Sequence, residues 1–197
     1  MKHKVDIGII GGTGVYSVEG MKVIDKINVK TPWGKPSDAV TIATYEENGK
    51  SVTLAFLPRH GKGHFIPPTA IPAHANMAAL KMLGCEAVIA FSAVGSLKEE
   101  IAPGHFVLPD QIIDRTRHRR DTYYDEGIVV HVSFGDPMDA NLAGILKEAI
   151  QKLQLPLHEK ETLICMEGSQ FSTRAESKLY KSWGAGIINM SVLPEAK

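Results

Sequence analysis

Three short turns in the sequence carry groups that bind anions. Each follows an apolar stretch typical of a buried strand: Gly11-Gly12-Thr13-Gly14 follows Val5–Ile10, Arg59-His60-Gly61-Lys62-Gly63-His64 follows Val52–Leu57, and Ser92-Ala93-Val94-Gly95-Ser96 follows Val88–Phe91. Such turns offer backbone amides, hydroxyl groups or cationic side chains at the carboxyl ends of strands, where open α/β sheets hold their ligands. Together they predict a phosphate site assembled from distant parts of the chain.

The glycine-rich turn is a weak signal when taken alone. Gly12 and Gly14 nearly match the dinucleotide fingerprint, but Ser17 stands at its third small position and no helix pattern follows. Both departures argue against a Rossmann site, and no P-loop pattern is present. An ordinary tight turn is the alternative reading of this motif.

The second turn, Arg59–His64, places four potential cations within six residues. An arginine guanidinium is a planar fork that matches phosphate oxygens, and a histidine can donate to an oxyanion. The alternative is a solvated basic loop. The histidines show no metal-ligand spacing with a cysteine or a carboxylate, so we expect no metal site.

The densest positive run in the chain is Arg115–Arg120. No aromatic residue is interleaved with its cations, and the chain as a whole is neutral, which argues against nucleic-acid binding. The run therefore predicts a solvated loop or an oligomer contact.

The composition is that of an ordinary globular protein. Of 197 residues, 44% are hydrophobic and 22% are charged, and the formal net charge is +0. We expect one domain over residues 1–197, with neither nucleic acid nor a membrane as a partner. No secretory signal and no apolar stretch of roughly 18 residues is visible. Cys85 and Cys165 lack CxxC spacing, which favours free thiols in a reducing compartment. The expected location is the cytoplasm, with the nucleus as a second location.

Strand-like and helix-like stretches alternate along the chain. The pattern predicts strands at Val5–Ile10, Met21–Lys30, Ala39–Tyr45, Ser51–Leu57, Glu86–Phe91, Phe106–Ile113, Glu161–Met166 and Ile187–Ser191. It predicts helices from Pro72 to Gly84, from an N-cap at Asp136 to about Leu153, and from the capping box at Thr173 to Gly184. Asn48-Gly49 predicts a hairpin. The expected fold class is α/β with a partly antiparallel sheet.

Six motifs occur together in one known family: Ile9–Gly14, Thr31–Asp38, Arg59–Gly61, Gly95–Leu97, Phe171–Ser177 and Asn189–Ser191. In combination they resemble the methylthioadenosine phosphorylases, the 6-aminopurine branch of the trimeric purine nucleoside phosphorylase family. The likeness covers the whole chain and is closer to fungal than to animal members. It implies the nucleoside phosphorylase fold, a central twisted mixed sheet surrounded by helices, and a homotrimer.

The resemblance also implies a set of phosphate ligands: Thr13, Arg59, His60, Ser92, the backbone of Ala93, and Ser191. His64 matches a histidine that lies near the phosphate in related enzymes. Ser92 and Ser191 stand where many members have threonine, and serine keeps the hydroxyl group.

For the nucleoside, the resemblance places Met190 against the ribose and Phe171 over the base. His131 corresponds to a residue that reaches from a neighbouring subunit toward the substituent on the 5′ carbon. Ser172 stands where the inosine and guanosine enzymes have a glutamate that accepts a hydrogen bond from a 6-oxopurine. Loss of that acceptor disfavours 6-oxopurines.

The implied reaction is the reversible phosphorolysis of 5′-methylthioadenosine to adenine and 5-methylthioribose-1-phosphate. Inorganic phosphate is the co-substrate, and no metal or other cofactor is expected. A general purine nucleoside phosphorylase is the alternative enzyme.

The chain ends where the family continues through a helix, a strand with paired aspartates that hold the adenine, and a terminal helix. We therefore expect a nucleoside phosphorylase domain that is truncated at its C-terminus. Three readings remain open: the ordered part of a longer enzyme, a shortened product with impaired activity, or a non-catalytic remnant that binds phosphate or pairs with complete subunits.

Overall fold

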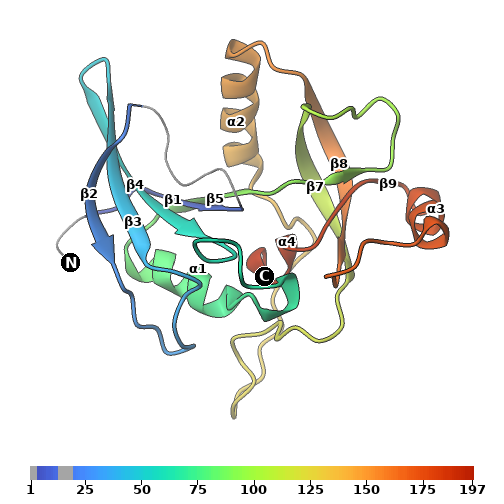
Figure 1. The fold of residues 1–197 in the computed structure, drawn as a ribbon, viewed down its shortest axis with the longest axis horizontal. Coiled ribbons are helices and arrows are strands. Elements are labelled where there is room, and N and C mark those ends of the chain that lie inside the picture. Colours follow the sequence, from blue (N-terminus) through green and yellow to red (C-terminus); the bar gives the residue numbers. More distant parts are fainter. Residues whose placement is uncertain (1–3, 13–19) are drawn as a thin grey trace. The chain divides into compact units, whose positions relative to one another are not determined.

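The computed structural model describes residues 4–12 and 20–197, and the chain forms two compact units, residues 1–93 and 94–197 (Figure 1). Both units combine a mixed sheet with helices, which confirms the expected α/β class. Among the described residues, no helix has the length and apolar character that crossing a bilayer requires.

The first unit contains a five-stranded mixed sheet in the order β2-β3-β4-β1-β5. Its strands are β1 (Ile7–Gly11), β2 (Lys22–Ile27), β3 (Val40–Glu47), β4 (Lys50–Pro58) and β5 (Ala87–Phe91). β4, β1 and β5 run parallel, whereas β2, β3 and β4 pair antiparallel. The predicted anion-binding segments that begin at Arg59 and Ser92 follow β4 and β5 of this parallel half.

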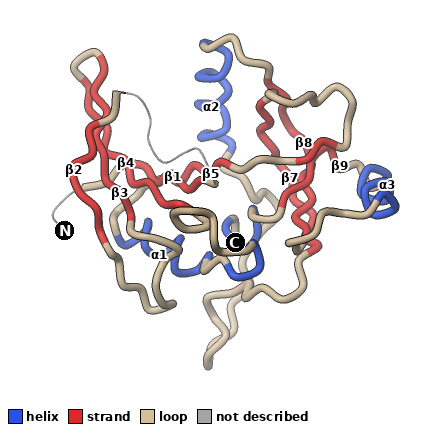
Figure 2. Tube along the Cα trace, viewed as in Figure 1, coloured by secondary structure: helices blue, strands red, loops and turns tan. Residues whose placement is uncertain are grey.

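The predicted hairpin joins β3 to β4 (Figure 2). Asn48 and Gly49 both have positive φ, at 51° and 74°. Positive φ at both central positions is the requirement of a type I′ turn, which suits the right-handed twist of the strands. The Asn-Gly signal is therefore confirmed.

One helix of the first unit packs on the sheet. A 3-10 turn at Pro68–Ala70 precedes α1 (Ala73–Met82), and Gly84 lies just past the helix end with φ +91°. Leu80 of α1 lies so near β1 that a Cβ on Gly8 would be 3.1 Å from it. The core formed between helix and sheet consists of Val5, Ile10, Val40, Ile42, Ala55, Leu57, Leu80, Leu83 and Cys85.

The second unit contains a four-stranded mixed sheet in the order β6-β9-β8-β7. Its elements are β6 (Gly95–Ser96), β7 (Phe106–Arg115), α2 (Ala140–Lys152), β8 (Leu157–Met166), α3 (Arg174–Ser182), β9 (Ala185–Asn189) and α4 (Val192–Glu195). β7, β8 and β9 are parallel, and β6 pairs antiparallel with β9. Ile101, Leu163, Cys165, Ile187 and Leu193 form its largest core cluster.

The predicted helix starts have different outcomes. The capping box of α3 is confirmed, because the Thr173 hydroxyl accepts from the Glu176 amide at 3.2 Å while the Glu176 carboxylate accepts from the Thr173 amide at 2.7 Å. The N-cap predicted at Asp136 is wrong. Asp139 caps α2 instead, since its carboxylate accepts from the Leu142 amide at 2.7 Å. Both aspartates satisfy the residue preference for an N-cap, and only the backbone geometry separates them.

Candidate functional site

The ends of three parallel strands meet at one edge of the first sheet. Gly11, the last residue of β1, is in register with Pro58 of β4 on one side and with Phe91 of β5 on the other. The following residues, including Arg59 and Ser92, therefore leave the sheet at the same edge. Of the three predicted turns, the one at Arg59–His64 is confirmed, whereas the segment predicted as a turn after β5 is irregular at Ser92 and Ala93 and forms strand β6 at Gly95–Ser96. The predicted ligand Thr13 lies outside the described residues.

Arg59 ties these strand ends together. Its side chain is buried, and the residue is only 1% exposed. Its amide donates to the Gly11 carbonyl at 2.9 Å, and its Nη1 donates to the Phe91 carbonyl at 2.8 Å. A buried cation held by carbonyl dipoles keeps positive charge at the sheet edge, where it favours an anion.

His60 has a defined ring orientation beside Arg59. Its Nδ1 lies 2.8 Å from the Ile66 carbonyl, which can only accept, so Nδ1 carries the hydrogen. Nε2 is then an acceptor when the ring is neutral and a donor when the ring is protonated. The ring of His64 stacks on that of His60 with centroids 4.1 Å apart. The predicted pair of histidines is therefore brought together, with His60 buried and His64 exposed.

The turn requires a glycine at position 61. Gly61 has φ +71°, and a Cβ there would lie 2.5 Å from Cε1 of Phe65 and 3.2 Å from the Ser37 carbonyl oxygen. Any side chain at this position would displace the turn that holds His60 and His64.

The sequence did not reveal the residues that hold this turn through hydrogen bonds. The Ser37 hydroxyl donates to the Pro58 carbonyl at 2.6 Å, and the Ser37 amide donates to Oδ1 of Asn76 at 2.8 Å. The Asp38 carboxylate accepts from the Lys62 amide at 2.8 Å. Asn76 is fully buried on α1. An amide side chain inside an apolar helix was the available signal, because buried polar groups need partners.

Ser92 and Ala93, the remaining predicted phosphate residues of the first unit, directly follow β5. Both are exposed. An exposed hydroxyl and an exposed backbone amide at this edge have the chemistry of an anion site.

In the second unit, Met190 and Ser191 follow β9 directly. Ser191 is 9% exposed and Met190 is half-buried. The Asn189 side chain accepts from the amides of Ser191 and Val192, both at 3.4 Å. The Asn189 side chain thus holds the start of the segment that carries the predicted sugar and phosphate contacts.

The predicted base and 5′-carbon residues lie at the surface of the second unit. Phe171 is 84% exposed, so it is not the core aromatic that its type alone would suggest. Ser172 hydrogen-bonds through its hydroxyl to the Ser177 hydroxyl at 2.8 Å. His131 is exposed, within a segment whose apolar residues Ile128, Val129 and Val132 are exposed as well.

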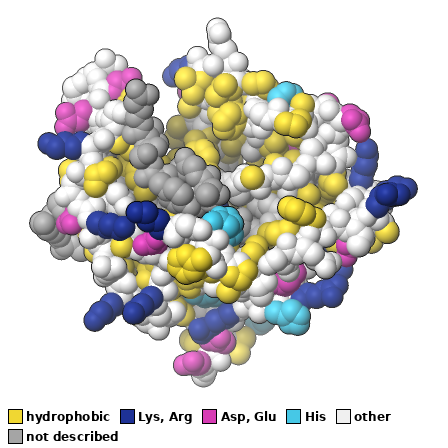
Figure 3. Space-filling model, viewed as in Figure 1, with side chains coloured by type: hydrophobic (Ala, Val, Ile, Leu, Met, Phe, Trp, Pro, Cys, Tyr) yellow, Lys and Arg dark blue, Asp and Glu magenta, His cyan; other side chains and the backbone are white. Residues whose placement is uncertain are grey.

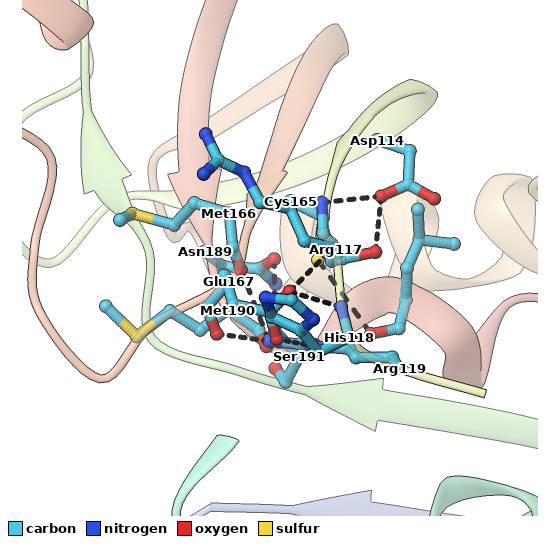
Figure 4. A network of polar contacts seen from close by, with 12 residues as sticks. Asp114, Arg117, His118, Arg119, Cys165, Met166, Glu167, Asn189, Met190 and Ser191 are labelled. Carbon is cyan, nitrogen blue, oxygen red and sulfur yellow. Dashed lines mark hydrogen bonds and ion pairs between the residues drawn. The ribbon is translucent and has the colours of Figure 1, made fainter. Parts of the chain in front are cut away.

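The second unit also contains a partly buried ion pair that the sequence did not predict (Figure 4). Arg119, from the basic run, has a side chain only 4% exposed, and its Nε lies 3.1 Å from Oε1 of Glu167. The expectation of a solvated run is therefore wrong for Arg119. The Glu167 carboxylate also accepts from the amides of Arg117 and His118.

This environment changes the acidity of Glu167. Burial alone would raise the pKa of its carboxyl group, but hydrogen bonds from the Arg117 amide and the Arg119 guanidinium outweigh burial and lower the pKa. Glu167 therefore stays ionised opposite Arg119 at neutral pH.

The described residues offer neither a nucleophilic thiol nor a metal site. Burial raises the pKa of both Cys85 and Cys165 to about 11, so both remain protonated thiols. Within residues 4–12 and 20–197, no cluster of histidine, cysteine or acidic side chains could hold a metal ion. On the face drawn in Figure 3, the described lysine and arginine side chains are spread among acidic ones.

Comparison with known proteins gives a consistent result. The model of the phosphorylase superfamily matches residues 6–197. S-methyl-5′-thioadenosine phosphorylase of Emericella nidulans is 53% identical over 98% of this chain and 56% of its own length. The enzyme of that name from Schizosaccharomyces pombe is 51% identical over 97% of this chain and 64% of its own length. The chain thus spans less than two thirds of the length of these relatives.

Solved structures agree with this result. A methylthioadenosine phosphorylase from an antarctic soil metagenomic library has a TM-score of 0.92 and 44% identity, covering 98% of this chain and 67% of its own. The methylthioadenosine phosphorylase of Schistosoma mansoni in complex with adenine has a TM-score of 0.88 and 35% identity, covering 98% of this chain and 76% of its own. These values confirm the expected fold.

Proposed function

The chain belongs to the phosphorylase superfamily, and from this premise we propose that it carries out the reversible phosphorolysis of 5′-methylthioadenosine. The products are adenine and 5-methylthioribose-1-phosphate. The observation that carries the proposal is the register of Gly11 with Pro58 and Phe91, which starts the segments that hold the proposed phosphate ligands Arg59 and Ser92 at one sheet edge. The names of the relatives supply the nucleoside.

In the proposed mechanism, the first unit binds the phosphate co-substrate through Arg59, His60, Ser92 and the backbone of Ala93. Thr13 and Ser191 are further proposed ligands. As the bond between the purine and the sugar breaks, positive charge develops on the sugar ring. The bound phosphate stabilises that charge and then forms the new bond to the anomeric carbon, while the leaving adenine takes up a proton. Positioning and electrostatics account for the catalysis, and no covalent enzyme intermediate is required.

The proposed nucleoside contacts lie in the second unit. Met190 packs against the ribose, and Phe171 offers its exposed ring to the base. Ser172 supports the choice of a 6-aminopurine, because its hydroxyl is held by Ser177 and it carries no carboxylate for the ring edge of a 6-oxopurine.

We propose a homotrimer as the assembly. Ile128, Val129 and Val132 are 59%, 80% and 61% exposed, and this apolar segment suits a subunit contact. His131 lies within the same segment, and we propose that it reaches the active site of the neighbouring subunit. Light scattering coupled to size-exclusion chromatography measures the mass and tests the trimer.

The experiment that tests the function is a coupled assay for adenine release from methylthioadenosine, with and without phosphate. Phosphate-dependent adenine release supports the proposal. Cleavage of inosine without cleavage of methylthioadenosine would indicate a general purine nucleoside phosphorylase. Phosphate binding with cleavage of neither nucleoside would indicate a non-catalytic member of the family.

A further inference from the structure

The guanidinium of Arg119 uses all of its donors inside the second unit. Besides the contact of Nε with Glu167, Nη1 donates to the carbonyls of Met190 and Leu193, both at 2.6 Å. Nη2 donates to the carbonyls of Met166, at 3.3 Å, and Glu167, at 2.5 Å. A guanidinium has five N–H groups, and these five contacts account for each of them.

The acceptors come from two separate strand ends. Met166 and Glu167 lie at the end of β8, whereas Met190 and Leu193 follow β9. Arg119 itself comes from the loop after β7, so one planar group connects three segments of the chain (Figure 4). Since the group is rigid and buried, it fixes the segments relative to one another.

Both connected segments carry proposed substrate residues. Met190 and Ser191 begin the segment after β9, and Phe171 follows Glu167 by four positions. Arg119 has no donor left for a phosphate or a sugar oxygen. It can therefore influence the substrate only through the residues that it holds.

We infer that Arg119 is a positioning residue of the active site, with Glu167 as its anchor, which sets the place of Met190 and Ser191 against the sugar and the phosphate. The inference rests on the proposed function for its kinetic consequences. Lysine cannot replace arginine in this role, because a single ammonium has three donors and no planar fork.

The kinetic test compares Arg119→Lys with Arg120→Lys in the protein. Arg120, the matched control, pairs with Asp125 at the surface, with side chains 44% and 38% exposed. We expect Arg119→Lys to lower kcat/KM by about 10- to 100-fold, as small misplacements of substrate contacts do. Arg120→Lys should stay within about twofold of the unchanged protein, because exposed pairs contribute little. If the unchanged protein is active, equal kcat/KM values for the two variants would overturn the inference.

A second readout does not depend on activity. With ¹³C-methyl methionine labelling, the Met190 methyl signal, assigned through Met190→Leu, reports the position of that side chain. Arg119→Lys should shift or broaden it, whereas the signals of Met77 and Met82 in the first unit should not change. An unchanged Met190 signal would overturn the inference.

The two readouts separate two kinds of failure. If the unchanged protein released no adenine, the proposed reaction would be wrong, and the Met190 signal would still decide the positioning role. If Arg119→Lys did not fold, Glu167→Gln would replace it in both measurements. Glutamine keeps an oxygen for the amides of Arg117 and His118 and removes the charge opposite Arg119. A shifted or broadened Met190 signal in Glu167→Gln then supports the inference, and an unchanged signal overturns it.

Discussion

The Nη1 of Arg59 donates to the carbonyl oxygen of Phe91 over 2.8 Å, which joins residues 32 positions apart in the sequence. Arg59 follows β4 and Phe91 ends β5, and the two strands flank β1. The bond therefore spans the end of β1 and fixes the turn that carries His60 relative to Ser92. The proposed phosphate site depends on this arrangement.

Replacing Arg59 with methionine should reduce both stability and phosphate use. The change leaves the Phe91 carbonyl without its buried donor, which costs about 1–3 kcal/mol in the free energy of unfolding. The loss of positive charge at the sheet edge should also raise the KM for phosphate by at least about tenfold, as expected for the loss of a charge-assisted hydrogen bond. Urea unfolding and phosphate-dependent kinetics measure the two effects. Full stability together with an unchanged KM would contradict the role assigned to Arg59.

Asn76 should act on the same site through Ser37. Asn76→Leu removes the acceptor of the buried Ser37 amide and should lower the free energy of unfolding by about 1–3 kcal/mol. The KM for phosphate should rise as well, because Ser37 holds Pro58, the residue before Arg59. Met77→Leu, one position further along α1, conserves volume and serves as the control, with an expected cost below about 1.5 kcal/mol. Equal effects of the two substitutions on the KM would argue against a supporting role for Asn76.

Ser172→Glu should change the choice of nucleoside. The new carboxylate would accept a hydrogen bond from a 6-oxopurine, so the ratio of kcat/KM for inosine to that for methylthioadenosine should rise at least about tenfold. Ser177→Ala is the control, because it removes the partner of the Ser172 hydroxyl without adding an acceptor. Competition assays with both nucleosides give the ratio directly. A rise of the same size in the control would show that the loop, not the carboxylate, sets specificity.

Glu167 should make the free energy of unfolding depend on pH. Its pKa is lowered in the folded protein, so its contribution is present above the ordinary glutamate pKa and is lost as pH falls through the lowered value. At pH 7, Glu167→Gln should lower the free energy of unfolding by about 1–3 kcal/mol, since it removes the charged partner of the Arg119 guanidinium. Below about pH 4 the difference between the two proteins should shrink, since the unfolded carboxyl is then largely protonated. Urea unfolding at several pH values measures this, and a constant difference would contradict the assignment.

The sequence contained enough information for most of the strands, the Asn48-Gly49 hairpin, the Thr173 capping box and the turn at Arg59–His64. These features rest on local patterns, namely residue preference at a cap or turn and apolar runs bounded by glycine. The register that places Pro58 and Phe91 on either side of Gly11 is not local and was not predicted, although the location of ligand groups at the carboxyl ends of parallel strands was.

The roles of Arg119 and Asn76 could not be predicted in the same way. Arg119 stands among similar basic residues, and its burial depends on Glu167 and Met190, which are 48 and 71 positions away. Nothing in the run itself distinguishes Arg119 from its neighbour Arg120, which is at the surface. Asn76 carried a signal, a polar residue in an apolar helix, but its partner Ser37 lies 39 positions away.

The proposed function requires inorganic phosphate to bind at the edge where β1, β4 and β5 end. A crystal structure of the protein grown with phosphate and adenine tests it most directly. We expect phosphate within hydrogen-bond distance of His60 Nε2 and the Ser92 hydroxyl. An active protein whose phosphate bound elsewhere, with this edge empty, would contradict it.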